Sequence, residues 1–228
     1  MKKLIFIMAG LIVMSCLHAQ SLDEIVKKYT AASKLDNVAN VKTIKITANM
    51  SVMGMELPMT LWMKNPDKIK TVTSVNGQDM IQVFDGTKGF TVNPMTGSTD
   101  PVEMTPDQVK QSLRTNMFKN YVADALKDGK LTLDGEENVN DKPAFKLKYD
   151  SDGVTSFIDI DKSSYYIVKT SSTTNGVAVD SYPSDYTETN GVLIPMKTST
   201  SAQGMDMVMT FTKVEIDTPM EDSIFSLK

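Results

Sequence analysis

The stretch ELPMTLWMKNPDKIK, residues 56–70, decides how the rest of the chain is interpreted. Met59, Leu61 and Met63 alternate with other residues, and Pro66 follows in a turn-forming NPD. Alternation with a period of two is typical of a β-strand that has one apolar face. The stretch therefore predicts a strand whose apolar face is turned either towards a packed core or towards a hollow that holds a hydrophobic ligand.

The same alternation continues on both sides of this strand. Turn sequences such as VNGQ, FDGTKG, TTNG, ETNG and SAQG separate the alternating segments, and they have the glycine and asparagine that hairpin turns require. We expect about ten or eleven strands, joined mostly by hairpin-length turns. Most of these strands are apolar on one side and rich in Thr, Ser, Lys or Asp on the other.

Two segments change to the helical period. Ser21 and Glu24 form a capping box for an amphipathic helix that should run to about residue 34. Thr105 caps a second helix, which is predicted to be long and to continue to Gly129. Both helices have an apolar stripe, so they are suited to cover one face of a sheet.

A sheet of this size must curl, split or close. The predicted fold class is therefore mainly β (α+β): a half-open antiparallel β-barrel of about ten or eleven strands, with helices covering the concave face. No repeat or Pro-rich linker interrupts the chain, and residues 21–228 are predicted to form a single domain.

Residues 1–20 are predicted to be a signal peptide, because two lysines precede a short apolar run at 4–13. Two cleavage sites remain open. Cleavage after Ala19 would release the protein into the periplasm, whereas a lipoprotein-type site would leave Cys16 acylated and anchor the protein to a membrane. Either site predicts export.

Most catalytic chemistry is excluded by composition. His18 is the only histidine and Cys16 the only cysteine, and both lie in the predicted leader. A mature chain without them has no Ser-His-Asp or Cys-His catalysis and no histidine or cysteine zinc site. Glu136 and Glu137, as neighbours on a strand, point to opposite faces and cannot flank one bond. We expect no enzyme activity, no cofactor and no metal.

Nucleic acid is not an expected ligand either. The formal net charge is −4 and the isoelectric point is about 5.1, whereas a nucleic-acid-binding protein normally has a basic stripe. Arg114 is the only arginine in the chain.

The segment MTLWMKNPDKIK, followed by FDGTKGFTVNPMTG, resembles the LolA/LolB-like superfamily of periplasmic lipoprotein carriers and receptors. The likeness extends from the exported leader through the first helix and this hairpin block to the strand-rich second half. It implies an open β-barrel closed by helices around a hydrophobic cavity that accepts acyl chains. It also implies an inner-membrane transporter and an outer-membrane receptor as partners.

The chain departs from that family at the turn proline. The best-studied carriers have an arginine immediately before this proline and an aromatic residue a few positions later. Asn65 and Ile69 occupy those positions here. In such carriers the arginine takes part in lid closure and lipoprotein uptake, so the departure concerns lipoprotein transport more than lipid binding.

The methionines raise the question of core or cavity. The chain has 17 methionines, of which Met1, Met8 and Met14 lie in the leader. Two apolar strand faces, at 59–63 and 205–211, are rich in the others. Methionine fills irregular gaps in cores, but its unbranched side chain also adapts to ligands of varied shape. The residues predicted to line a cavity are Met59, Leu61, Met63, Ile69, Met205, Met207, Met209 and Phe211.

The predicted function is a periplasmic carrier or chaperone that binds the acyl chains of lipoproteins or other lipids and moves them towards the outer membrane. The alternative is an envelope sensor or protein-binding module on the same fold, without lipid cargo. Trp62, on the polar side of its strand, is predicted to pack under a helix or loop rather than to contact a ligand.

Overall fold

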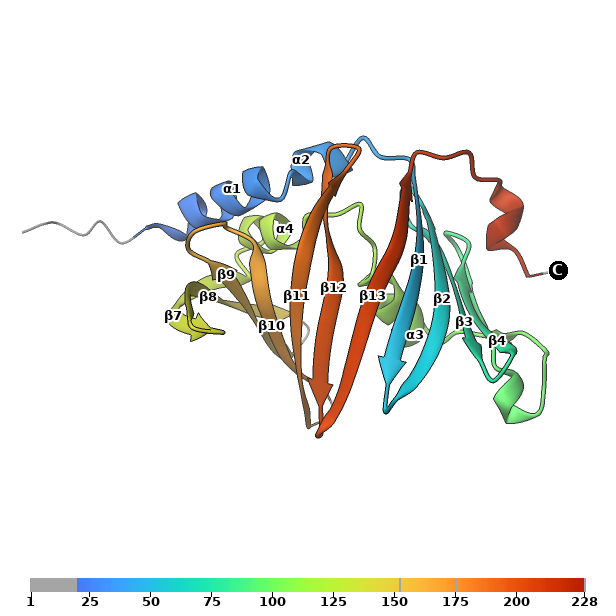
Figure 1. The fold of residues 1–228 in the computed structure, drawn as a ribbon. Coiled ribbons are helices and arrows are strands. Elements are labelled where there is room, and N and C mark those ends of the chain that lie inside the picture. Colours follow the sequence, from blue (N-terminus) through green and yellow to red (C-terminus); the bar gives the residue numbers. More distant parts are fainter. Residues whose placement is uncertain (1–19, 152, 175, 228) are drawn as a thin grey trace, which may run out of the picture.

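One antiparallel sheet of 13 strands forms the body of the protein (Figure 1). We describe a computed structural model, in which residues 20–151, 153–174 and 176–227 are placed. Residues 1–19, with Cys16 and both predicted cleavage sites, lie outside the described residues. The strand order is β6-β5-β4-β3-β2-β1-β13-β12-β11-β10-β9-β8-β7, so the sheet has two edges and is not closed.

The predicted half-open β-barrel with helices is confirmed, with more strands than the predicted ten or eleven. The short strand β6, for example, was not predicted. In chain order the strands are β1 (Thr43–Val52), β2 (Met55–Lys64), β3 (Lys68–Val75), β4 (Gln78–Phe84), β5 (Gly89–Val92), β6 (Val102–Glu103), β7 (Leu131–Val139), β8 (Lys142–Ser151), β9 (Val154–Asp161), β10 (Ile167–Thr174), β11 (Val177–Thr189), β12 (Val192–Ala202) and β13 (Met205–Ile216).

The first and last strands meet in the middle of the sheet. β1 pairs with β13 in an antiparallel register that places Ile44 opposite Ile216. On its other side β1 pairs with β2, which places Ile44 opposite Met63. The remaining pairs join strands that follow each other in the chain. The β1–β13 pair therefore unites two halves, β1–β6 and β7–β13, into one sheet.

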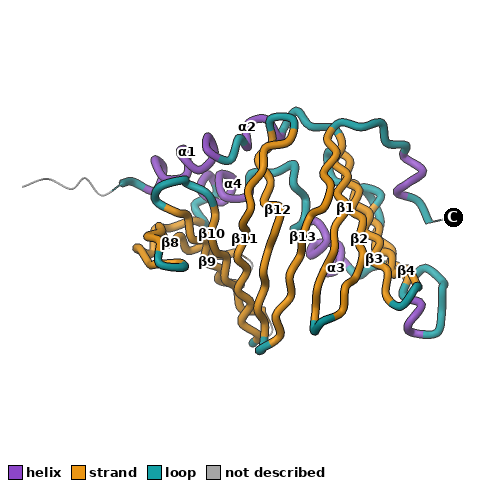
Figure 2. The backbone as a smooth tube through the Cα atoms, viewed as in Figure 1, coloured by secondary structure: helices purple, strands orange, loops and turns teal. Residues whose placement is uncertain are grey.

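The helices are α1 (Leu22–Ala32), α2 (Leu35–Val38), α3 (Pro106–Leu113) and α4 (Tyr121–Lys127), with two 3₁₀ turns, η1 (Pro94–Thr96) and η2 (Asp222–Phe225). We call the face of the sheet on which the four α-helices pack the inner face, and the opposite one the outer face. Figure 1 views the outer face, with α3 behind β13 and β1. Figure 2 shows that loops cap both ends of the strands.

The capped starts of the predicted helices are confirmed. Ser21 caps α1 through its side chain, and Thr105 and Gln108 form a reciprocal capping box at α3. The predicted continuous helix from 105 to 129 is wrong, because residues 114–120 leave the helical path between α3 and α4.

The break between α3 and α4 is held by one buried asparagine. Asn116 donates through Nδ2 to the backbone oxygen of Pro66 at 2.8 Å, and its Oδ1 accepts from the backbone N–H of Phe118 at 2.8 Å. Asn120 then caps α4 by accepting from the backbone N–H of Ala123. These bonds satisfy backbone groups that a helix would otherwise pair.

Two apolar clusters lie on the inner face. The first lies under α2 and the 114–120 segment, and the second lies under α1 and α4. The buried members of the first are Val38, Val41, Ile44, Ile46, Ala48, Met63, Ile69, Phe118, Val192, Ile194 and Ile216. Those of the second are Ile25, Val26, Tyr29, Val122, Ala125, Leu131, Phe145, Leu147 and Ile160.

The outer face has a smaller cluster beside the C-terminal turn. Val83, Met220 and Phe225 are buried there, and Trp62 packs against them. Trp62 thus packs, as predicted, against a cluster that contains Phe225 of η2 and Met220 of the loop before it. Among the described residues, none of the helices has both the length and the apolar character needed to cross a bilayer.

Candidate functional site

The predicted cavity-lining residues of β2 and β3 lie on the inner face, inside the first cluster. Met63 is fully buried between Ile44 and Ile69 in the strand register, and Ile69 is buried as well. Met59 and Leu61 are partly buried and pack against the same cluster. In this conformation Met63 and Ile69 are core residues, and their contact with a ligand stays a prediction.

The predicted residues of β13 differ among themselves. Met209 and Phe211 are partly buried and pack against the first cluster. Met207 lies opposite Val52, the last residue of β1, and so nearer the end of the strands. Met205 is 49% exposed, at the turn between β12 and β13. The strand alternation therefore identified a shared face, and burial decreases along it towards the rim.

The inner face holds a cavity of about 400 Å³ that the sequence did not identify. It lies between α3 with the segment that follows it and the hairpin of β8 and β9, so it bridges the two apolar clusters. We call it the inner cavity. Its lining residues are Lys110, Leu113, Arg114, Lys119, Tyr121, Tyr149, Ser151, Val154, Ser156 and Ile158.

Local structure places three cations on one side of the inner cavity. Lys110 and Arg114 are one helical turn apart, so they share a face of α3 with Leu113 beside them. Lys119 follows the buried Phe118, which fixes the backbone there. Tyr121 donates through its hydroxyl to the backbone oxygen of Leu113 at 2.7 Å and ties α4 to α3.

The opposite side of the inner cavity comes from two strands and is mostly apolar. Val154 and Ile158 of β9 lie on the face that carries the second cluster, and Tyr149 of β8 packs against that cluster. Ser156 adds a hydroxyl between them. The cavity thus has a basic side and an apolar side, and its volume is within the range of small-molecule sites.

The described charged residues that line the inner cavity are all basic. None of its described lining residues is acidic. Lys110 has a partner of its own, whereas no ion pair of Arg114 or Lys119 occurs within the described ranges. Burial, and to a smaller degree Asp124, raises the pKa of Tyr121, so this phenol stays neutral.

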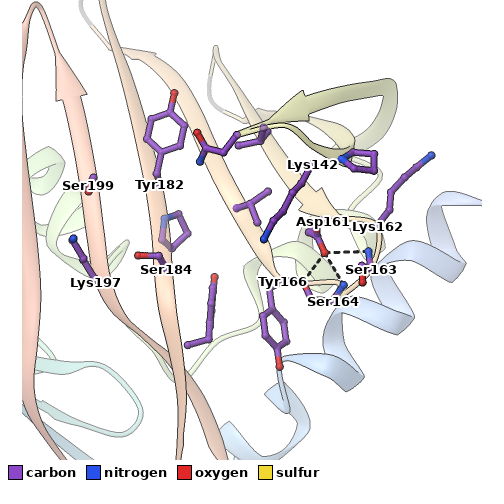
Figure 3. Close-up of a pocket in the computed structure, with 16 residues that line it drawn as sticks. Lys142, Asp161, Lys162, Ser163, Ser164, Tyr166, Tyr182, Ser184, Lys197 and Ser199 are labelled. Atoms are coloured by element: carbon purple, nitrogen blue, oxygen red, sulfur yellow. Dashed lines mark hydrogen bonds between the residues drawn. The ribbon is translucent and has the colours of Figure 1, made fainter.

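A second hollow, of about 930 Å³, lies on the outer face, and we call it the outer groove. Ser199 and Lys197 of β12 pair with Tyr182 and Ser184 of β11 there, and they alternate with inner-face residues such as Met196. Figure 3 shows these side chains beside the β9–β10 turn. The lining residues are Val139, Asn140, Lys142, Pro143, Asp161, Lys162, Ser163, Ser164, Tyr166, Val168, Tyr182, Pro183, Ser184, Tyr186, Lys197 and Ser199.

Hydrogen bonds fix one wall of the outer groove. The Oδ1 of Asp161 accepts from the backbone N–H groups of Ser163 and Ser164 at 3.0 and 2.6 Å, and from the Ser164 hydroxyl at 2.8 Å (Figure 3). Burial alone would raise the pKa of Asp161, but these bonds lower it overall. Tyr186 donates to the backbone oxygen of Ile167 at 2.8 Å, and its ring lies 4.8 Å from that of Tyr166.

The two glutamates considered in the sequence belong to separate ion pairs. Glu136 pairs with Lys162 at 2.5 Å, and Glu137 pairs with Lys146 at 2.6 Å and with Lys169 at 3.5 Å. Ion pairs of this kind are typical of structural residues. The two carboxylates are not arranged on either side of a single substrate bond.

Asp159 lies beside the Glu137 pair and is fully buried. It is 0% exposed, and neither of its carboxylate oxygens has a hydrogen-bond partner in the described part of the chain. Burial, followed by the negative charge of Glu137, raises the pKa of Asp159 to about 6, against a smaller lowering by Lys146 and Lys169.

Solved structures with the same architecture are known. A domain assigned to outer membrane lipoprotein sorting in Vibrio parahaemolyticus superposes with a TM-score of 0.60 at 12% identity, over 90% of this chain and 95% of that one. A LolA superfamily protein from Nitrosomonas europaea gives 0.59 at 11% identity, over 92% and 99%. A DUF1329 family protein from Desulfovibrio piger gives 0.59 at 13% identity, over 89% and 97%.

No family model and no curated protein matches the sequence. The similarity is therefore one of structure, and at these identities it concerns the fold. The chain has the LolA-like fold.

Proposed function

We propose that this protein is a periplasmic carrier that binds the acyl chains of lipoproteins or other lipids in a cavity on the inner face of its sheet and moves them towards the outer membrane. The inner cavity is the observation that carries the proposal, because it combines an apolar wall of Val154 and Ile158 with a helix, α3, that has no buried residue. The LolA-like fold supports it, since one similar domain is assigned to lipoprotein sorting. The proposed role is binding and transport, not catalysis.

The cover of the inner cavity is suited to movement. None of the residues of α3 is buried, although Leu113 packs partly against the first cluster. By contrast, α1 buries three residues, Ile25, Val26 and Tyr29. Leu113 of α3 packs against the first cluster, as Met59 and Leu61 do, so displacement of α3 would uncover part of that apolar surface.

The energetics fit a carrier that must also release its cargo. Each methylene transferred from water contributes about 0.8 kcal/mol, so a long acyl chain gains on the order of 10 kcal/mol before costs. The apolar contacts of α3 with the sheet must be broken to admit the chain, which offsets part of this gain. The methionine faces of β2 and β13 lie outside the described lining of the inner cavity, so they add tolerance of chain shape only where the cavity enlarges to reach them.

The proposal includes export. The predicted leader would be removed, and an inner-membrane transporter and an outer-membrane receptor would be the donor and the acceptor. If Cys16 is acylated, the protein is instead a membrane-anchored receptor. The intact mass of the protein purified from the periplasm and from membranes distinguishes the two, because acyl chains add a defined mass to Cys16.

Asn65 favours lipid cargo over the arginine-dependent uptake known for related carriers. Its Nδ2 donates to the backbone oxygen of Val41 at 2.8 Å, so the side chain is engaged within its own turn. The residue that stands in the arginine's place thus stabilises the loop before β3 rather than reaching a lid.

Native mass spectrometry of the protein purified after export tests the proposal. We expect masses with bound lipid, which Ile158→Asp should remove by placing a charge in the apolar wall. Met95→Asp, at a side chain that is 59% exposed on η1, is the matched control and should retain the lipid. Trp62 fluorescence is a poor reporter because this side chain is on the outer face. Absence of lipid from the unmodified protein would overturn the proposal.

The outer groove favours a second candidate function, a protein-binding module. Tyr166, Tyr182 and Tyr186 offer aromatic surface, and Lys142 and Lys197 add positive charge, which suits an extended acidic segment of a partner. A photo-cross-linker at Tyr182 would test it. This candidate predicts one cross-linked partner that is lost in Lys142→Glu/Lys197→Glu and retained in Ile158→Asp; the opposite pattern would contradict it.

A further inference from the structure

We propose that the lipid held in the inner cavity has a negatively charged headgroup, which Arg114 and Lys119 bind while Val154 and Ile158 contact the hydrocarbon. This inference rests on the proposed carrier function and names the class of its cargo. Neither the fold nor the predicted methionine faces implies a headgroup charge, so the inference depends on the cavity alone.

The sign of the charge is the first argument. The whole chain has a net charge of −4, with 28 acidic and 24 basic side chains. The described lining of the inner cavity nevertheless has three basic residues and no acidic one. Apart from Lys110, which has a partner of its own, Arg114 and Lys119 give the described lining a charge opposite in sign to that of the molecule, as expected where an anion must be attracted to an acidic protein.

The second argument is that the charges are available. Arg114 and Lys119 are both exposed, and no carboxylate within the described ranges pairs with either. Other lysines on the sheet are paired within the described residues, for example Lys146 with Glu137. Two unpaired cations beside an apolar wall can thus be neutralised by a ligand without breaking an existing ion pair.

A purely structural explanation accounts for only part of this arrangement. Arg114 is the C-cap residue of α3, where the helix dipole favours a cation whatever the function of the protein. Lys119 has no such explanation, because it lies between the helices and precedes the N-cap of α4. A helix dipole would in fact disfavour a cation close to that end.

The chemistry of the two side chains suits a headgroup. The guanidinium group of Arg114 can bind a carboxylate or a phosphate through two parallel N–H bonds, and the ammonium of Lys119 adds a mobile point charge. Ser156 and Tyr149 contribute hydroxyl groups to the same lining. A carboxylate and a phosphate both offer a negative charge and oxygen acceptors to these side chains. The ligand could therefore be a fatty acid or an acidic phospholipid, and the experiment must distinguish the two.

The experiment measures lipid choice rather than total binding. The delipidated, exported protein is incubated with vesicles of equal parts phosphatidylglycerol and phosphatidylcholine that share the same acyl chains, and bound lipids are counted by mass spectrometry. We expect at least a tenfold preference for phosphatidylglycerol, which corresponds to about 1.4 kcal/mol. In Arg114→Gln/Lys119→Gln the ratio should fall towards one, chiefly through loss of phosphatidylglycerol binding.

Lys27→Gln/Lys127→Gln is the matched control, since it makes the same change in net charge at exposed positions on α1 and α4 outside the cavity. It should keep the preference. A competition arm with oleate identifies the anion: displacement of phosphatidylglycerol shows that a carboxylate suffices, and its absence shows that phosphate is required.

The outcomes separate this inference from the carrier proposal. Equal binding of both lipids by the unmodified protein, or a preference that survives Arg114→Gln/Lys119→Gln, overturns the headgroup assignment and leaves the carrier function in place. Failure of the unmodified protein to bind any lipid in any arm overturns the carrier function itself.

Discussion

Met63 and Met205 were predicted from the same alternation, yet their surroundings differ completely. Met63 is 0% exposed at the centre of the first cluster, and Met205 is 49% exposed at a hairpin turn. Alternation tells which face a side chain is on, because the period of a strand is two. It does not tell what covers that face, which depends on helices far away in sequence.

This contrast gives the first prediction. Met63→Ala should lower the free energy of unfolding by about 2–5 kcal/mol, because it leaves a cavity in a packed core. Met205→Ala should change it by less than about 0.5 kcal/mol. Urea unfolding of the two variants checks this, and equal effects would contradict the described burial.

Asp159 gives a prediction about pH. Its pKa is raised to about 6 in the folded protein, above the ordinary value of 3.8. The folded state therefore binds this proton more tightly than the unfolded state does. The free energy of unfolding should then decrease as the pH rises from 3.8 to about 6. Asp159→Asn removes the ionisation. It should raise the free energy of unfolding at pH 8 by about 1–3 kcal/mol, with no gain near pH 3.5.

The groups that face Asp159 are Glu137, Lys146 and Lys169. Both lysines keep Glu137 as a partner in the variant, so no cation is left alone. Asp206→Asn, at an exposed carboxylate on β13, is the control and should change stability by less than about 0.5 kcal/mol at either pH. A pH-independent effect of Asp159→Asn would contradict the prediction.

At the scale of elements, the capped helix starts could be predicted and the helix break could not. Thr105 and Gln108 are three residues apart, so the capping box is visible in the sequence. The apolar stripe continues past residue 113, which favours one long helix. The break depends on Asn116, whose partner is the backbone of Pro66, 50 positions away. The sequence around Asn116 does not indicate that contact.

The inner cavity illustrates the same limit. Lys110 and Arg114 are four residues apart in a predicted helix, so a shared basic face was a detectable signal. Their opposition to Val154 and Ile158 results from the way the sheet curves under α3. Sequence alone could identify the residues on each element, but not that the two elements enclose a space.

The looseness of α3 leads to a prediction at this scale. Because α3 has no buried residue and α1 has three, backbone amides of α3 should exchange with deuterium faster than those of α1. Hydrogen exchange with mass spectrometry checks this, and bound lipid should slow the exchange of α3. Equal protection of both helices in the lipid-free protein would contradict a movable cover.

For the whole molecule, most of the strand order follows from hairpin turns that can be recognised in the sequence. Asn-Gly and Gln-Gly turns join β3 to β4, β11 to β12 and β12 to β13. The pair that joins strands far apart in the chain is β1 with β13, which places Ile44 opposite Ile216 in the centre of the sheet. This pairing depends on the match between the apolar faces of two strands that are far apart in the sequence. No local pattern indicates such a match, so the pairing could not be predicted.

Deletion of residues 205–228 tests the importance of that pair. The truncated protein would expose two long strand edges, on β1 and β12, and would lose the wall that Met209 and Phe211 contribute. We expect loss of soluble monomer and of cooperative unfolding, measured by gel filtration and circular dichroism. Deletion of 221–228 alone removes only η2 from the outer face and should leave a soluble fold. A soluble, cooperative 1–204 protein would contradict this reasoning.

The meeting of β1 and β13 also sets an order in time. A ribosome must synthesise the whole chain from Val52 to Ile216 after β1 before β13 is complete, and at about 5–20 residues per second this interval is on the order of ten seconds or more. Throughout that interval β1 can pair with β2 on one side, but its other edge lacks β13. An unpaired edge of this kind is open to pairing with other chains, so we expect the yield of folded protein to depend on how well that edge is protected during synthesis.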